Sequence, residues 1–313
     1  MTTHNRPTSK RIIGYWLRLS LFAIIVSLIG LFPIVLRQVD IILTPKGSPD
    51  IGTPNVLNQP YQDVTFMSKD GLTISAWYIE GERDEALILV HGINANRRGM
   101  LSEAKILSEA GYPLLMLDLR GNGLSEGDEL TYGYKEAWDV SAGVDYLLDL
   151  PEVEQVGAVG HSLGGAVAVR AAAIDERIKA VVVESSYSSL PNAVNDAFNE
   201  IVMLPQWPFQ PFVVALAEYR VGLNLSDVNS IRDIATISPR PVYIIHGTKD
   251  HLFLSYHADM MYEAAQAPKT LWLIEGMGHQ SPAHAMPDAY HERVVTFFER
   301  AFEACESGVR CGS

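Results

Sequence analysis

The spacing of hydrophobic and polar positions changes several times along the chain, and each change marks a predicted element. Short apolar runs rich in branched residues are typical of buried parallel strands. They lie at residues 86–90, 113–118, 155–160, 180–184, 241–246 and 270–274. Stretches with helical periodicity lie between or after them, at residues 97–110, 134–149, 164–174, 255–266 and 287–304. This alternation predicts an α/β fold with a mostly parallel, twisted sheet and helices on both faces.

Two further β-rich runs precede the alternating region. Residues 63–66 and 73–78 flank Lys69-Asp70-Gly71, a turn sequence in which glycine supplies a positive φ. We therefore expect an antiparallel hairpin that leads into the parallel sheet. In such sheets a ligand binds beyond the carboxyl ends of the strands, so functional residues are expected at that edge.

The longest apolar run lies near the N-terminus, at residues 19–36, and carries no charged residue. At about 1.5 Å per residue it is just long enough to span a bilayer. A cleaved signal peptide and a buried soluble helix are the alternatives, but no small-residue cleavage site follows the run and no polar face interrupts it. Residues 1–44 are therefore predicted to be a tail and a single-pass transmembrane anchor. More basic residues precede the span than follow it, which places the N-terminus in the cytoplasm and the main domain outside it.

The rest of the chain divides into a linker and one domain. Residues 45–60 have turn chemistry without periodicity, which is typical of a linker, so the folded domain is expected over residues 61–313. On this division, a protein that lacks residues 1–44 is expected to be a soluble, active domain. Residues 186–238 form an apolar, aromatic-rich insertion that prolines divide into short helices. The insertion is either a helical cap over the strand ends or an ordinary pair of core helices.

The segment 155–173 changes from strand to helix within a few residues. Gly160 and Gly164 flank Ser162 at positions i−2 and i+2. A strand that turns so sharply leaves no room for side chains beside a strained serine. The pattern therefore predicts a nucleophile elbow with the Ser162 hydroxyl exposed above the sheet. G-x-S-x-G also occurs by chance in many chains, but the flanking strand and helix favour the catalytic interpretation.

A serine hydroxyl needs an adjacent base to become a nucleophile. Among nine histidines, His279 lies in a glycine-rich loop after the last strand, at the edge where Ser162 is expected. Asp250 follows the strand 241–246 and would orient the imidazole. The alternatives are that Asp250 only caps the next helix, or that Glu184, at the end of the preceding strand, is the acid.

Acyl transfer also requires hydrogen-bond donors where the oxyanion develops. The candidates are the backbone amides of Leu163, which follows the nucleophile, and of Ile93, in the loop after the strand 86–90. Asn94 either assists or holds that loop. Seven other histidines are assigned elsewhere. Structural positions are expected for His161, His91 and His246, and surface or helix positions for His251, His257, His284 and His291.

From about Tyr61 to the final helix, the chain resembles the α/β-hydrolase superfamily, because it contains several motifs of that superfamily in the same order. They are Val90-His91-Gly92, Asp118-Leu119-Arg120-Gly121-Asn122-Gly123-Leu124-Ser125, Gly160-His161-Ser162-Leu163-Gly164-Gly165, Ile245-His246-Gly247-Thr248-Lys249-Asp250 and Gly276-Met277-Gly278-His279. Within the superfamily, the chain looks like serine-aminopeptidase-like and membrane-anchored α/β hydrolases. This resemblance implies hydrolysis of esters or thioesters, and less often of amides. The chain departs from the family pattern in two places: the Asp-x-x-Val-Pro often seen after the acid is Asp250-His251-Leu252-Phe253 here, and Asn122 replaces a usual histidine.

Charge and composition exclude several other classes. The net charge of −13 and the pI near 5.1 argue against nucleic-acid binding, because no basic excess is available to neutralise phosphates. No H-E-x-x-H, Walker A or dinucleotide-binding pattern occurs, so neither a metal nor a cofactor is expected. The two cysteines, Cys305 and Cys311, lie far from the strand ends. They either pair, if the domain lies outside the cytoplasm, or are free thiols.

Together these features predict a membrane-anchored serine hydrolase that cleaves a carboxylic ester or thioester through an acyl-enzyme on Ser162. The apolar insertion favours a small-molecule or lipid-like ester as substrate. A serine aminopeptidase is one alternative, for which the insertion offers Glu200 and Glu218 to hold a substrate amino terminus. A non-catalytic scaffold that binds a ligand under the cap is the other.

Overall fold

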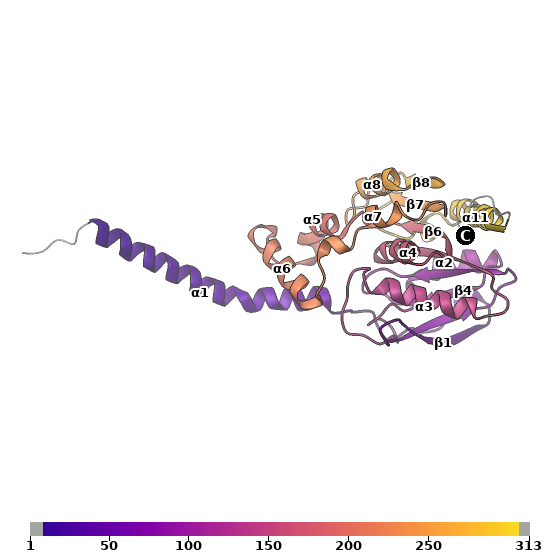
Figure 1. Cartoon of the computed structure of the whole chain (residues 1–313), viewed down its shortest axis with the longest axis horizontal. Coiled ribbons are helices and arrows are strands. Elements are labelled where there is room, and N and C mark those ends of the chain that lie inside the picture. Colours follow the sequence, from indigo (N-terminus) through magenta and orange to yellow (C-terminus); the bar gives the residue numbers. More distant parts are fainter. Residues whose placement is uncertain (1–8, 307–313) are drawn as a thin grey trace, which may run out of the picture.

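The structure, a computed structural model, describes residues 9–306, without the side chains of residues 9–12, 23–29 and 306. An eight-stranded sheet lies at the centre, in the order β1-β2-β4-β3-β5-β6-β7-β8 (Figure 1). The strands are β1 (Tyr61–Met67), β2 (Thr73–Ile79), β3 (Glu85–Val90), β4 (Leu114–Leu117), β5 (Gln155–His161), β6 (Ile178–Glu184), β7 (Val242–Gly247) and β8 (Lys269–Ile274). Only the β1–β2 and β2–β4 pairs are antiparallel. The predicted mostly parallel sheet with an antiparallel lead-in is confirmed.

Both faces of the sheet are buried, which explains why its strands are continuous apolar runs rather than alternating ones. In β3, Ile88 and Val90 belong to the core on one face, and Leu87 and Leu89 to the core on the other. Helices α3 (Glu136–Leu148), α4 (Leu163–Ile174) and α8 (Tyr256–Ala264) cover the first face. Helices α2 (Leu101–Glu109) and α11 (Thr296–Glu306) cover the second. Short helical segments complete the layers: η1 (Asn55–Leu57), η2 (Arg97–Met100), α9 (Pro282–Ala285), α10 (Pro287–Tyr290) and the π-helical η4 (His291–Val295).

The insertion between β6 and β7 forms a helical layer at the carboxyl end of the sheet. It contains α5 (Leu190–Ile201), α6 (Gln206–Val221), η3 (Leu225–Asp227) and α7 (Ser230–Ile234). The Ser189 hydroxyl begins α5 by accepting a hydrogen bond from the Asn192 amide, and Gly222, with φ of 68°, ends α6. In Figure 1, α6 lies beside the last part of the N-terminal helix α1 (Ser9–Leu43).

The C-terminal part of α1 is packed against this insertion. Val35, Val39 and Leu43 are spaced four residues apart and form one apolar stripe on the helix. The stripe packs on residues of α5 and α6 such as Phe198 and Val213, and none of its side chains is more than 7% exposed. The expectation that residues 1–44 are separate from the domain is therefore wrong for this end of the helix.

The predicted linker is also held in place. The Gly47 amide donates a hydrogen bond of 3.0 Å to Asn122 Oδ1, and Asn96 Nδ2 donates one of 2.9 Å to the Ser48 carbonyl. Asn122, the position that departs from the family pattern, thus ties the segment after α1 to a loop at the strand ends.

Within the part of the chain that the structure describes, no helix is long and apolar enough to cross a membrane. Side chains 23–29, in the middle of the predicted span, lie outside that description, as does Cys311. The structure gives no support to the predicted transmembrane anchor, which stays a prediction from the sequence.

Candidate active site

Ser162 lies in a sharp turn between β5 and α4. Its φ of 57° and ψ of −119° are rare for a residue with a side chain and indicate local strain. A Cβ atom on Gly160 would lie 2.1 Å from the Gly164 carbonyl oxygen, and one on Gly164 would lie 2.0 Å from that of Val90. Both positions therefore require glycine. Ser162 is only 3% exposed, because it opens into a pocket beneath the insertion rather than into solvent as the sequence suggested.

The structure brings Ser162, His279 and Asp250 into one hydrogen-bonded chain. Ser162 Oγ lies 3.1 Å from His279 Nε2, and His279 Nδ1 lies 2.7 Å from Asp250 Oδ2. With the proton on Nδ1, the serine hydroxyl donates to Nε2 and the ring donates to the carboxylate. Nε2 is then placed to take the proton of Ser162.

Asp250 is held by backbone donors as well as by His279. Its Oδ1 accepts hydrogen bonds of 2.9 Å from the amides of Leu252 and Phe253. These bonds close a turn before α8, whose N-cap is Ser255, so Asp250 does not cap the following helix as the alternative required. Burial acts to raise the pKa of Asp250, but the hydrogen bond and charge of His279, with the Phe253 amide, outweigh it and lower the pKa.

Glu184, the alternative candidate for the catalytic acid, does not contact His279. Its Oε1 accepts a hydrogen bond of 2.6 Å from the Tyr290 hydroxyl, and its Oε2 lies 3.6 Å from His161 Nδ1. The rings of His161 and His279 lie 5.5 Å apart. His161 therefore separates Glu184 from His279, and the structure pairs His279 with Asp250 instead.

The two candidate oxyanion donors belong to residues that line the same pocket as Ser162. Leu163 is the first residue of α4, so its amide is at the helix N-terminus, where backbone donors have no partner within the helix. Ile93 lines the same pocket as Ser162 and Leu163. A Cβ on Gly92 would lie 3.3 Å from Ser162 Cβ, so the loop before Ile93 passes close to the serine. Asn94, with φ of 56°, shapes this turn.

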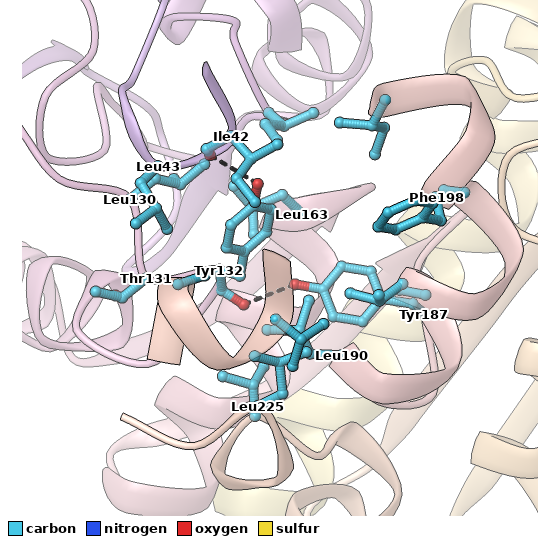
Figure 2. Close-up of a pocket in the computed structure, with 18 of the residues that line it drawn as sticks. Ile42, Leu43, Leu130, Thr131, Tyr132, Leu163, Tyr187, Leu190, Phe198 and Leu225 are labelled. Atoms are coloured by element: carbon cyan, nitrogen blue, oxygen red, sulfur yellow. Dashed lines mark hydrogen bonds between the residues drawn. The ribbon is translucent and has the colours of Figure 1, made fainter. Parts of the chain in front are cut away.

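An apolar cavity of about 120 Å³ extends from Ser162 beneath the insertion. Its walls come from α5 and α6, from the loop 130–132, and from the last residues of α1, Ile42 and Leu43 (Figure 2). None of the described residues that line it is charged. Glu200 and Glu218 are not among them, and Glu218 Oε1 accepts a hydrogen bond from the Leu225 amide.

His257, predicted at a surface or helix position, lies on α8 but not at the surface. It is fully buried, where its Nδ1 accepts a hydrogen bond of 3.1 Å from the Ser188 amide and its Nε2 lies 3.1 Å from Asp196 Oδ2. Burial lowers its pKa to about 4, so the ring is neutral at ordinary pH. Ser188 is also fully buried, and its hydroxyl accepts a hydrogen bond from Asn192 Nδ2. This cluster fastens the start of the insertion to α8.

Comparisons with known proteins agree with this architecture. Residues 85–229 match a family model described as alpha/beta hydrolase fold. The uncharacterized protein YfhR of Salmonella typhi is 27% identical over 264 residues, which cover 78% of this chain and 83% of that protein. The esterase Pf2001 of Pyrococcus furiosus superposes with a TM-score of 0.70 at 26% identity, over 82% of this chain and 99% of that one. Est1E of Butyrivibrio proteoclasticus, solved with ferulic acid, shares the fold with a TM-score of 0.63 at 21% identity, over 77% and 100% of the two chains. The sheet, the turn at Ser162 and these likenesses show an α/β-hydrolase fold and are consistent with the α/β-hydrolase superfamily.

Proposed function

We propose that this protein is a serine hydrolase that cleaves carboxylic ester or thioester bonds through an acyl-enzyme on Ser162. The observation that carries the proposal is the unbroken hydrogen-bonded chain from Ser162 Oγ through His279 to Asp250. A strained turn at the nucleophile and an esterase among the similar structures support it.

The geometry supports the following sequence of steps. Ser162 Oγ attacks the acyl carbon while His279 Nε2 takes its proton, and Asp250 stabilises the resulting imidazolium. The amides of Leu163 and Ile93 would stabilise the oxyanion of the tetrahedral intermediate. The leaving alcohol or thiol then takes the proton from His279. A water molecule, activated by the same ring, attacks the acyl-enzyme, and the free acid leaves.

The pocket favours an ester or thioester over a peptide. An aminopeptidase needs a negative or polar group to hold the amino terminus of its substrate, and such a charge would cost several kcal/mol in an apolar cavity unless it were paired. The described lining is mostly aliphatic and aromatic, and it contains no carboxylate. A neutral acyl group fits this chemistry.

We also propose that the protein is attached to a membrane. This part of the proposal rests only on the sequence, on the apolar run at residues 19–36. Fractionation of cells that express the full chain tests it. We expect the protein in the membrane fraction, released by detergent but not by high salt. Recovery in the supernatant without detergent would remove this part and leave the catalytic proposal untouched.

The enzymatic proposal is tested with a fluorophosphonate probe and two substrate series. We expect the wild-type protein, but not Ser162→Ala, to be labelled, and kcat/KM to be measurable for p-nitrophenyl esters. An unlabelled wild-type protein without esterase activity would favour the non-catalytic scaffold. Efficient cleavage of aminoacyl amides with poor ester turnover would favour the aminopeptidase.

A further inference from the structure

Helix α1 supplies one wall of the pocket, and its residues are distant in sequence from those of the other walls. Ile42 and Leu43 line the cavity that contains Ser162, together with residues of the insertion. In the view of Figure 2, they lie on one side of the cavity, and Phe198 and Tyr187 lie on the other. A segment that the sequence assigns to a membrane anchor is therefore part of the candidate substrate site.

This wall is fastened to the body of the domain. The Tyr132 hydroxyl donates a hydrogen bond of 2.7 Å to the Ile42 carbonyl, and the Leu130 amide donates one of 2.8 Å to the Leu43 carbonyl. The last carbonyl groups of a helix have no partner within the helix, so these two bonds also complete the end of α1. The loop 130–132 thereby fixes the position of both side chains relative to Ser162.

The same end of the helix is fastened to the insertion. Gln38 Oε1 accepts a hydrogen bond of 3.1 Å from the Met203 amide, and Asp40 forms an ion pair with Arg220. Val39 is fully buried against α6. Since contacts on two sides hold α1, a bound group meets a fixed boundary there.

The chemistry of the boundary indicates what it contacts. Ile42 and Leu43 are branched aliphatic residues, and the described lining around them is uncharged. A substrate with a straight, neutral acyl chain on the carbon that Ser162 attacks would gain about fourfold in affinity for each methylene that it buries. The gain would end where the chain reaches the wall. This limit would fall at α1.

We propose that the C-terminal end of α1 is the specificity-determining wall of the acyl site, and that Ile42 sets the longest aliphatic acyl chain that the enzyme accepts. The inference rests on the proposed serine hydrolase function. It goes beyond that function by assigning substrate selection to the N-terminal helix rather than to the cap alone.

A set of three variants tests the wall. Ile42→Trp adds volume at the boundary, Ile42→Ala removes it, and Ile34→Trp is the matched control, because Ile34 is on the same helix, 45% exposed and absent from the lining. For Ile34→Trp we expect kcat/KM for p-nitrophenyl acetate and for the decanoate both within about twofold of wild type. For Ile42→Trp we expect a larger loss on the decanoate than on the acetate. For the decanoate we expect a loss of about tenfold or more, the equivalent of two buried methylenes. Ile42→Ala should move the optimum to longer chains.

Two outcomes would overturn the proposal: an unchanged profile in both Ile42 variants, or equal losses on acetate and decanoate. If Ile42→Trp does not fold, the Ile42→Ala profile decides alone. The proposed function fails separately, since it predicts that the wild-type protein hydrolyses the acetate and is labelled at Ser162 whatever its chain-length profile.

Discussion

The Tyr290 hydroxyl donates a hydrogen bond of 2.6 Å to Glu184 Oε1 at the fully buried end of β6. Glu103 is also fully buried, and it accepts a hydrogen bond from the Ser281 hydroxyl. Burial raises the pKa of Glu184 to about 8. Burial and the charge of Glu184 raise the pKa of Glu103 to about 7. The folded protein therefore binds protons more tightly at this pair than the unfolded chain does.

The first prediction is that Glu103 and Glu184 contribute stability that is lost as pH rises from about 5 to about 8. In that range the unfolded chain has released protons that the two carboxyl groups still hold in the folded state, so their contribution to the free energy of unfolding decreases with pH. Urea denaturation at several pH values measures the slope. Glu184→Gln, which cannot ionise, should flatten it, and an equal slope in the variant would contradict the assignment.

The second prediction concerns Ser162 and His279. Ser162→Ala and His279→Ala should each lower kcat for an ester by roughly 10⁴ or more, because one variant removes the nucleophile and the other its base. The double variant should be little slower than either single one, since the two side chains act as a unit. Purified variants with unchanged circular dichroism should be compared. Near-wild-type turnover by either single variant would exclude the mechanism.

The third prediction separates the two candidate acids. In Asp250→Asn, the amide oxygen can keep the bonds from Leu252 and Phe253, so the NH₂ group faces His279 Nδ1. The ring is then held with its proton on Nε2 and cannot accept one from Ser162. We expect a drop in kcat of up to about 10⁴ with the fold retained. Glu184→Gln is the control and should change kcat little; the reverse result would move the acid to β6.

The fourth prediction concerns the glycines beside the serine. Gly164→Ala would place a Cβ 2.0 Å from the Val90 carbonyl oxygen, a distance that requires β3 and α4 to move apart. We expect loss of soluble, folded protein or a large fall in melting temperature. Gly30→Ala is the control, because an added Cβ there has nothing within 4 Å. Equal melting temperatures for the two variants would show that the turn is looser than described.

The fifth prediction compares two truncations. A chain that starts at residue 31 keeps the stripe Val35, Val39 and Leu43, whereas one that starts at residue 45 exposes the cap residues beneath it. We expect the shorter chain to melt at a lower temperature and to lose selectivity for long acyl esters, and the longer one to behave like the full protein. Identical melting curves and ester profiles would restore the sequence-based boundary at residue 44.

The sheet could be predicted from the sequence because both of its faces are buried, so that each strand is a short uninterrupted apolar run. The residues of the candidate site could be located because each one follows a strand of a parallel sheet, and such strands all end at the same edge. Ser162, Asp250 and His279 come from three separate segments that this rule alone brings together.

Other features depend on contacts that leave no local pattern. The stripe at Val35, Val39 and Leu43 lies in or next to a continuous apolar run, where a helical period cannot be distinguished. His257 is buried by partners on the insertion, and nothing near it in the sequence indicates them. Asn122 gives no sign by itself that its amide would meet the Gly47 backbone.

The position of α1 also imposes an order on folding. During synthesis the stripe at its C-terminal end leaves the ribosome early, but the residues that bury it, Phe198, Val213 and Ala217, follow only after six strands of the sheet have been made. Contacts so distant in sequence form slowly, and exposed apolar surface attracts other chains in the meantime. Newly made protein therefore carries an uncovered hydrophobic stripe until α5 and α6 arrive, which makes this end of α1 a natural target for chaperones.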